Sequence, residues 1–107
     1  MDKEQIRVVN EIKNFLKKVG GAFERVILFG SYARGDYGED SDVDLIIVSN
    51  DFKKKKSYKR GVELYNLWYS ENDVDVDFVC LTPEEFDAES KIVGVIKYAI
   101  RDGIVIK

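Results

Sequence analysis

Two short, continuous apolar runs, at residues 26–29 and 43–48, constrain the fold of this chain more than any other feature. Each run is long enough for a buried β-strand and too short for a buried helix. The segment between them is polar and contains glycine, so it predicts a loop with a turn or two of helix at residues 32–34. We therefore expect two buried strands joined by a polar connection.

The remaining elements follow from periodicity. Apolar residues recur at helical spacing over residues 2–19, before Gly20, and again over residues 58–70. Valine alternates with aspartate from residue 74 onward, which indicates a third strand ending near residue 80. A capping box at residues 82–85 opens a helical stretch that is bent around Ser90 and stops at Gly103, before a terminal strand at 104–106.

This order of elements predicts an α/β (α+β) fold with a small mixed β-sheet of about four strands flanked by helices. The 107 residues are close to the commonest size of one domain, and 45% of them are apolar, which is enough for one core. No repeat, linker or shift in composition divides the chain. We therefore expect a single domain over residues 1–107.

The chain contains no histidine, and this absence excludes several kinds of chemistry. A Ser-His-Asp or Cys-His nucleophile, a histidine general base and a histidine-ligated zinc all need that side chain. An enzyme of this composition must use carboxylates, hydroxyls, lysines and a metal ion that prefers oxygen. The net charge of −3 argues against a dedicated nucleic-acid-binding domain.

The composition also predicts where the protein works. The single cysteine, Cys80, allows no internal disulfide and fits a reducing compartment, where we expect it to be an ordinary core residue. The N-terminal stretch is amphipathic and lacks the continuous apolar run of a signal peptide, and no run reaches the length of a membrane span. The sequence predicts a cytoplasmic protein with no membrane partner.

Asp42 and Asp44 open the second apolar run and point to one face of its strand, because side chains alternate along a strand. Ionised and unpaired, two such carboxylates repel each other and resist burial, and a bound divalent cation relieves both costs. Asp75 and Asp77 repeat the arrangement, so one of them completes a set of three carboxylates if the two strands are neighbours. Each pair taken alone is more often just the polar end of a strand. Oxygen-only ligands select Mg²⁺ or Mn²⁺.

Gly30 and Ser31 interrupt the first run directly after its last apolar residue. Glycine lets the backbone turn sharply and approach a ligand, and Ser31 is placed to cap the helical turn that follows. A helix start with free N–H groups and a hydroxyl beside them can hold a phosphate. On its own the pair is a weak signal, since an ordinary helix cap explains it more often.

Read together, these motifs are specific. Gly30-Ser31, ten further residues and then Asp42-x-Asp44 in an apolar strand resemble the signature of the DNA polymerase β-type nucleotidyltransferase superfamily. The blocks ILFGSYARGD, SDVDLIIV and VDFVCLTPEEF extend the resemblance over nearly the whole chain, to the stand-alone minimal nucleotidyltransferases of bacteria and archaea. The resemblance implies an enzyme that transfers a nucleoside monophosphate, AMP from ATP by preference, to an acceptor hydroxyl. It also implies two Mg²⁺ ions as cofactors, for which Mn²⁺ can substitute.

The resemblance further assigns roles to individual residues. Gly30 and Ser31 would hold the β- and γ-phosphates of ATP or another nucleoside triphosphate. Asp42 and Asp44 would bind the nucleotide and the metal ions and act in catalysis. Asp77 would be the third catalytic and metal-binding carboxylate, with Asp75 left open as the alternative because it lies on the same face.

The acceptor is not evident, because larger members of the superfamily select it with a helical domain that has no counterpart in these residues. The resemblance implies a protein partner, a helical protein of the HEPN family, with the pair acting as toxin and antitoxin and AMP moved onto a tyrosine of the partner. Two alternatives stay open. One is transfer to a small molecule or an RNA end, and the other is a nucleotide- or partner-binding module that has lost catalysis.

The basic run at residues 53–56, followed by Lys59 and Arg60, has two readings. It is either a solvated loop or a counter-charge to the triphosphate or to an acceptor nucleic acid, the less favoured partner. Lys59 and Arg60 are expected in the first turn of a helix, where cations are unfavourable, and this favours a functional role. Trp68 and Tyr69 are adjacent on that helix, so we expect one of them on the surface.

Overall fold

The computed structural model describes residues 1–107 and contains five α-helices and one four-stranded sheet. The elements in chain order are α1 (Lys3–Val19), β1 (Arg25–Phe29), α2 (Ser31–Arg34), β2 (Val43–Val48), η1 (Asn50–Lys54), η2 (Ser57–Lys59), α3 (Val62–Glu71), β3 (Val76–Leu81), α4 (Pro83–Ser90), α5 (Val95–Asp102) and β4 (Ile104–Val105). The sheet order is β3-β2-β1-β4, with β1 antiparallel to β2 and β4 and with β2 parallel to β3. The predicted α/β (α+β) class with a small mixed sheet is confirmed.

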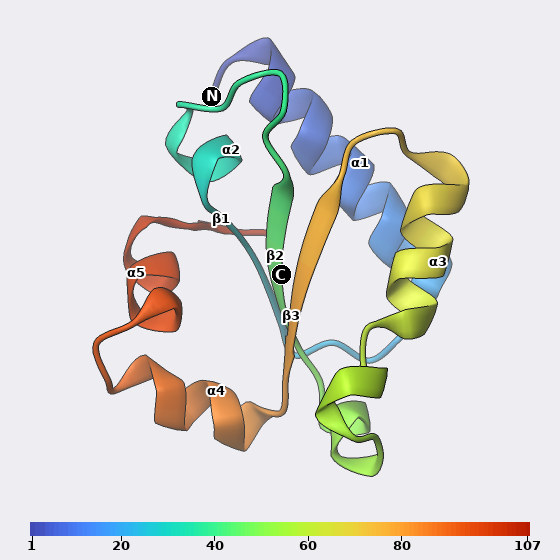
Figure 1. Ribbon diagram of the computed structural model, residues 1–107, viewed down its shortest axis with the longest axis vertical. Helices are drawn as coiled ribbons and strands as arrows, with labels where there is room; N and C mark the ends of the chain where they lie inside the picture. The colour runs from blue at the N-terminus through green and yellow to red at the C-terminus, as the bar shows by residue number, and fades with distance from the viewer.

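Helices cover both faces of the sheet (Figure 1). On one face α1 and α3 pack against the larger core, and on the other α4 and α5 enclose a smaller one. Because side chains alternate along a strand, Asp44 lies on the same face as Ile46 and Val48 of the smaller core. At the upper ends of β2 and β3 in the view of Figure 1, Asp42, Asp75 and Asp77 are exposed and Asp44 is partly buried.

The long helix α1 begins and ends where the sequence predicts. The Asp2 carboxylate accepts from the Gln5 N–H at 2.8 Å, and the Gln5 side chain accepts from the Asp2 N–H at 2.9 Å, which forms a capping box. Gly20 ends the helix in the left-handed conformation, with φ of +65°. The fully buried side chains of Val8 and Ile12 fix this helix against the larger core.

The helix expected over residues 58–70 begins later, at Val62. The basic run forms the two short 3-10 helices η1 and η2, and the buried Phe52 of η1 anchors it to the core. Arg60 lies before α3, donates to the main-chain carbonyl of Cys80 at 3.3 Å and pairs with Glu85. The expectation that Lys59 and Arg60 start the helix was therefore wrong, because these contacts hold Arg60 at the sheet edge ahead of it.

The adjacent aromatic residues of α3 separate as predicted. Trp68 is fully buried and donates its indole N–H to the Val74 carbonyl at 2.7 Å, whereas Tyr69 remains 47% exposed. Cys80 packs against the larger core, and burial raises the pKa of its thiol to about 11. No helix in the chain combines the length and the apolar composition needed to cross a membrane.

Candidate active site

The turn after β1 brings the backbone directly against Asp44. Gly30 adopts φ of +76° and ψ of −154°, a region that is essentially restricted to glycine. A Cβ atom at this position would overlap Oδ2 of Asp44. Because β1 and β2 are antiparallel with Phe29 opposite Asp44, the sheet register itself places the glycine turn beside the carboxylate.

The short helix α2 follows the turn, but Ser31 is not its cap. Gly30 occupies the N-cap position without a side-chain hydrogen bond, and Ser31 is the first helical residue, so the expectation that Ser31 caps the turn was wrong. The first N–H groups of a helix have no acceptor within it. These groups and the Ser31 hydroxyl therefore lie together beside Gly30.

Asp44 and Asp77 lie opposite each other on neighbouring parallel strands. Such strands run about 4.8 Å apart, so two carboxylates facing the same way repel each other. Asp44 is partly buried and Asp77 is exposed. The sequence predicted a set of three carboxylates only if these two strands are neighbours, and β2 and β3 are neighbours in the sheet.

Asp42 and Asp75 lie one residue before β2 and β3, and both are exposed. The Asp75 carboxylate accepts a hydrogen bond from the Tyr69 hydroxyl at 3.3 Å. The negative charges that act on Asp44 are those of Asp77 and Asp42. The geometry therefore favours Asp77 over Asp75 as the third carboxylate of the candidate site.

The electrostatics of this cluster centre on Asp44. Burial of the carboxylate, followed by repulsion from Asp77 and from Asp42, raises the pKa of Asp44 to about 6, while Arg34 acts in the opposite direction. The negative charge of the ionised Asp44 carboxylate is therefore only partly balanced by neighbouring positive charge. A cation bound beside Asp44 would relieve both the burial and the repulsion.

The donor set fits a divalent cation in its chemistry. As the side chains stand, no three acidic, histidine or cysteine residues form a group that could hold a metal ion. The atoms available at Asp42, Asp44 and Asp77 are all carboxylate oxygens, which are the donors that Mg²⁺ and Mn²⁺ prefer. A bound cation would offset the burial and the repulsion that raise the pKa of Asp44, so the three residues suit such an ion in their chemistry.

This electrostatic strain predicts a pH dependence of stability in the absence of metal. The folded-state pKa of Asp44, about 6, lies above its ordinary value of 3.8, so the folded protein binds this proton more tightly than the unfolded chain. The resulting stabilisation is full below the ordinary value and is lost as the pH rises through about 6. After a discount for solvent screening, we expect wild type to lose about 1–2 kcal/mol relative to Asp44→Asn between about pH 4 and pH 7. Urea unfolding of both proteins in EDTA measures this difference, and parallel pH profiles would contradict it.

A cavity of about 500 Å³ opens beside Gly30, between the end of β1 and α5. Phe29 and Arg34 line it from the side of the glycine turn, and Tyr98 and Asp102 line it from α5. The Arg34 side chain also donates to the Asp36 carboxylate at 3.2 Å. Sequence spacing gave Arg34 no role, and the fold places it where its charge acts on Asp44 and borders this cavity.

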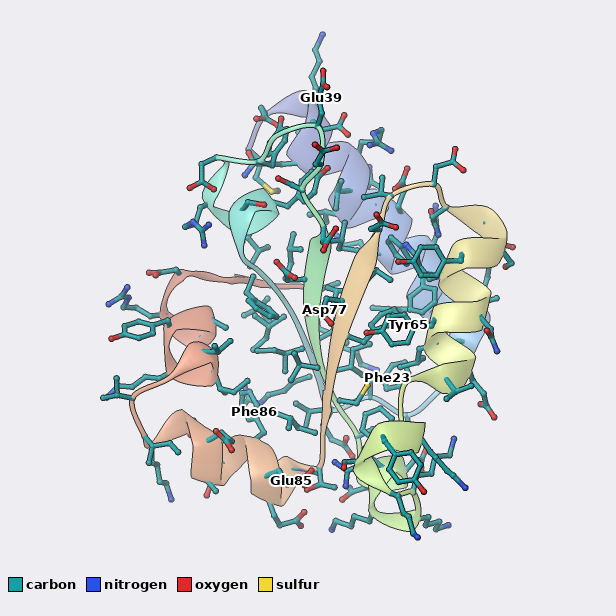
Figure 2. All side chains as sticks on the ribbon, in the orientation of Figure 1. Phe23, Glu39, Tyr65, Asp77, Glu85 and Phe86 are labelled. Carbon is teal, nitrogen blue, oxygen red and sulfur yellow. The ribbon has the colours of Figure 1, made fainter.

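A second contact that sequence reasoning missed involves α3. The Tyr65 hydroxyl donates to Oδ1 of Asp77 at 3.2 Å and accepts from the Phe78 N–H at 3.0 Å. Figure 2 shows the Tyr65 ring reaching from α3 toward the strand that carries Asp77. The spacing of Tyr65 and Tyr69 by four residues could have indicated a shared helix face, but not the strand that it meets.

The basic run lies at the far end of β2 from this cluster. It begins after Val48, whereas Asp44 lies near the start of the same strand. Lys53 pairs with Glu84 at 2.7 Å, and Lys55 lies 3.9 Å from Glu63. The lysines of this run therefore do not lie where they could neutralise phosphates bound at Gly30, because the length of β2 separates the run from Gly30.

A glycine turn between β1 and a short helix lies against aspartates on two adjacent parallel strands, which is the arrangement that the resemblance to nucleotidyltransferases implies. The chain belongs to the nucleotidyltransferase domain family, whose family model matches residues 9–106. The resemblance seen in the sequence is therefore confirmed at the level of the family.

Curated relatives in Methanocaldococcus jannaschii carry the name "putative protein adenylyltransferase". One is 51% identical over 45 residues, which is 41% of this chain and 45% of the relative. A second is 38% identical over 71 residues, which is 60% of this chain and 72% of the relative. The match to the first thus spans less than half of that protein's length.

Solved structures share the fold. A crystal structure described as that of a "putative nucleotidyltransferase" from Sulfolobus solfataricus has a TM-score of 0.64 and 26% identity, over 94% of this chain and 80% of the other. A toxin-antitoxin crystal structure with AMP-PNP has a TM-score of 0.65 and 23% identity, over 92% of this chain and 72% of that one. At that identity the second likeness concerns the fold alone.

Proposed function

We propose that this protein is a Mg²⁺-dependent nucleotidyltransferase that moves AMP from ATP onto a hydroxyl of a partner protein. The observation that carries the proposal is the opposition of Asp44 and Asp77 on adjacent strands, directly beside the Gly30 turn. Membership of the nucleotidyltransferase domain family supports nucleotide transfer. The names of the Methanocaldococcus relatives support AMP as the group and protein as the acceptor.

In this reaction the acceptor oxygen forms a bond to the α-phosphorus, the bond from that phosphorus to its bridging oxygen breaks, and pyrophosphate leaves. Gly30 and Ser31 hold the β- and γ-phosphates through the N–H groups of α2 and the serine hydroxyl. Asp42, Asp44 and Asp77 would hold two Mg²⁺ ions, and Asp77 would accept the proton of the acceptor hydroxyl. When bound, Mg²⁺ polarises the phosphoryl oxygens and neutralises the charge that develops on pyrophosphate.

The partner in this proposal is a helical protein of the HEPN family, with the pair acting as toxin and antitoxin. The fold shared with a toxin-antitoxin structure and the names of the relatives support a protein partner. We further propose that residues 1–107 form one minimal nucleotidyltransferase domain, which is supported by a family match over residues 9–106 and by a single continuous sheet.

The acceptor class is tested by labelling. The protein is incubated with Mg²⁺, ATP labelled at the α-phosphate and an extract of its source cells, which is then divided into protein, RNA and small-molecule fractions. The proposal expects label in protein that survives RNase and is removed by phosphodiesterase. Label confined to RNA or to a small molecule would replace the protein acceptor, and no label in any fraction would favour a module that has lost catalysis.

Arg34 supplies a further prediction, because its charge acts on Asp44 and its side chain borders the cavity beside Gly30. We propose that its guanidinium binds a phosphate of ATP. Arg34→Gln is then expected to raise KM for ATP by about tenfold, the effect of losing one charge-assisted contact, and to change kcat little. Arg25→Gln, at the opposite end of β1, is the matched control and is expected to leave both constants unchanged. Equal KM values for the two variants would exclude the contact.

A further inference from the structure

Two tyrosines of α3 make the same pair of contacts along the open edge of β3. The Tyr65 hydroxyl accepts from the Phe78 N–H at 3.0 Å and donates to the Asp77 carboxylate at 3.2 Å. The Tyr69 hydroxyl accepts from the Val76 N–H at 3.1 Å and donates to the Asp75 carboxylate at 3.3 Å. Each phenol thus binds a main-chain N–H and the carboxylate of the residue before it.

This repetition follows from the spacing of the two elements. Four residues of a helix advance about 6 Å, and two residues of a strand advance about 6.6 Å, so successive tyrosines on one helix face meet alternate residues of the strand. β3 lies at the edge of the sheet, where every second N–H group points away from β2. The tyrosines satisfy these N–H groups and restrain the neighbouring aspartates at the same time.

The two contacts differ in what they restrain. Asp77 lies opposite Asp44, and its charge contributes to the raised pKa of Asp44. Asp75 precedes the strand and makes no such contribution. Tyr65 is also more firmly held than Tyr69, because its ring packs edge-on against Phe78 with centroids 4.8 Å apart, whereas Tyr69 is 47% exposed.

We infer that Tyr65 is a positioning residue for Asp77 in nucleotide transfer, and this inference rests on the proposed function. By occupying Oδ1 of Asp77, its hydroxyl limits rotation of the carboxylate and leaves Oδ2 as the oxygen for the metal and the acceptor proton. The hydroxyl itself stays on the sheet edge, bound to the Phe78 N–H, and does not act as the acceptor of AMP.

The test compares Tyr65→Phe with Tyr69→Phe. Both variants remove one hydroxyl, one hydrogen bond to the edge of β3 and one hydrogen bond to an aspartate, so they form a matched pair for structural effects. Both are expected to unfold a few degrees below wild type. Only Tyr65→Phe is expected to lower kcat, by about tenfold, with KM for ATP unchanged, because Asp77 acts on the acceptor side of the reaction.

A binding measurement separates this inference from the proposed function. Mn²⁺ is titrated into each protein and free Mn²⁺ is followed by electron paramagnetic resonance, with no nucleotide or acceptor present. Tyr65→Phe is expected to weaken Mn²⁺ binding several-fold, and Tyr69→Phe to leave it unchanged. If wild type transfers no nucleotide, the proposed function fails, and the Mn²⁺ titration still decides whether Tyr65 positions Asp77.

Two results would overturn the inference. The first is an equal effect of the two variants on Mn²⁺ binding and on kcat, which would reduce Tyr65 to a structural cap of the edge strand. The second is AMP attached to Tyr65 itself, detected by peptide mass spectrometry after incubation with ATP and Mg²⁺, which would make the residue a substrate instead of a positioning group.

Discussion

Replacing Asp44 or Asp77 with asparagine is expected to lower the rate of nucleotide transfer at least about 10³-fold, because each change removes a carboxylate from the proposed two-metal site. The fold should survive both changes. Asparagine has nearly the same shape, and loss of either charge removes repulsion between two residues that lie opposite each other on β2 and β3. Asp44→Asn should even be more stable than wild type at pH 7 without metal, since the raised pKa of Asp44 marks an unfavourable charge.

The matched control for this prediction is Asp75→Asn. Asp75 carries the same side chain two residues before Asp77, but it lies outside the strand and is bound by Tyr69. We expect this variant to retain transfer within a few-fold of wild type. Single-turnover rates with labelled ATP measure all three variants, and a loss at Asp75 with full activity at Asp77 would reverse the assignment of the third carboxylate.

Gly30→Ala is expected to destabilise the protein by about 1–3 kcal/mol and to lower transfer more than about 100-fold. The φ of +76° with a ψ of −154° is strained for any residue with a Cβ atom, and that atom would overlap Oδ2 of Asp44. The backbone must shift or the carboxylate must turn away. Either movement separates the proposed phosphate site from the proposed metal site.

A double-mutant cycle separates the two costs of this substitution. In an Asp44→Ala background the overlapping carboxylate is absent, so Gly30→Ala should cost clearly less stability than in wild type. Gly20→Ala serves as a control, because Gly20 has φ of +65° and open space around it at the end of α1. It should lose stability and keep transfer. Equal costs in both backgrounds would mean that Gly30 and Asp44 are not in contact.

The sequence was sufficient for the strands because their signals are local. The runs around Phe29 and Asp44 are bounded by glycine and aspartate, and the observed limits of β2, Val43–Val48, are those expected. The neighbouring positions of Gly30 and Asp44, by contrast, depend on the antiparallel pairing of β1 and β2, which the sequence did not predict. The limits of the strands need no knowledge of distant contacts.

The features that the sequence did not predict depend on tertiary contacts. Phe52 is one apolar residue in a lysine run and has no periodicity, so the burial that shapes η1 left no sequence signal. Arg60 stops short of α3 because it binds the carbonyl of Cys80, twenty residues away in sequence. The contacts of Tyr65 and Tyr69 require α3 to lie along the edge of β3, which periodicity within one helix cannot show.

The central claim, that the Asp44 cluster transfers a nucleotide, is tested most directly with ATP labelled separately at the α- and γ-phosphates. Wild type and Asp44→Asn are each incubated with Mg²⁺, both forms of ATP and the acceptor fraction. Wild type is expected to attach the α-label to the acceptor and to release the γ-label as pyrophosphate, while Asp44→Asn is expected to do neither. Transfer of the γ-label to the acceptor, or equal α-labelling by the two proteins, would contradict it.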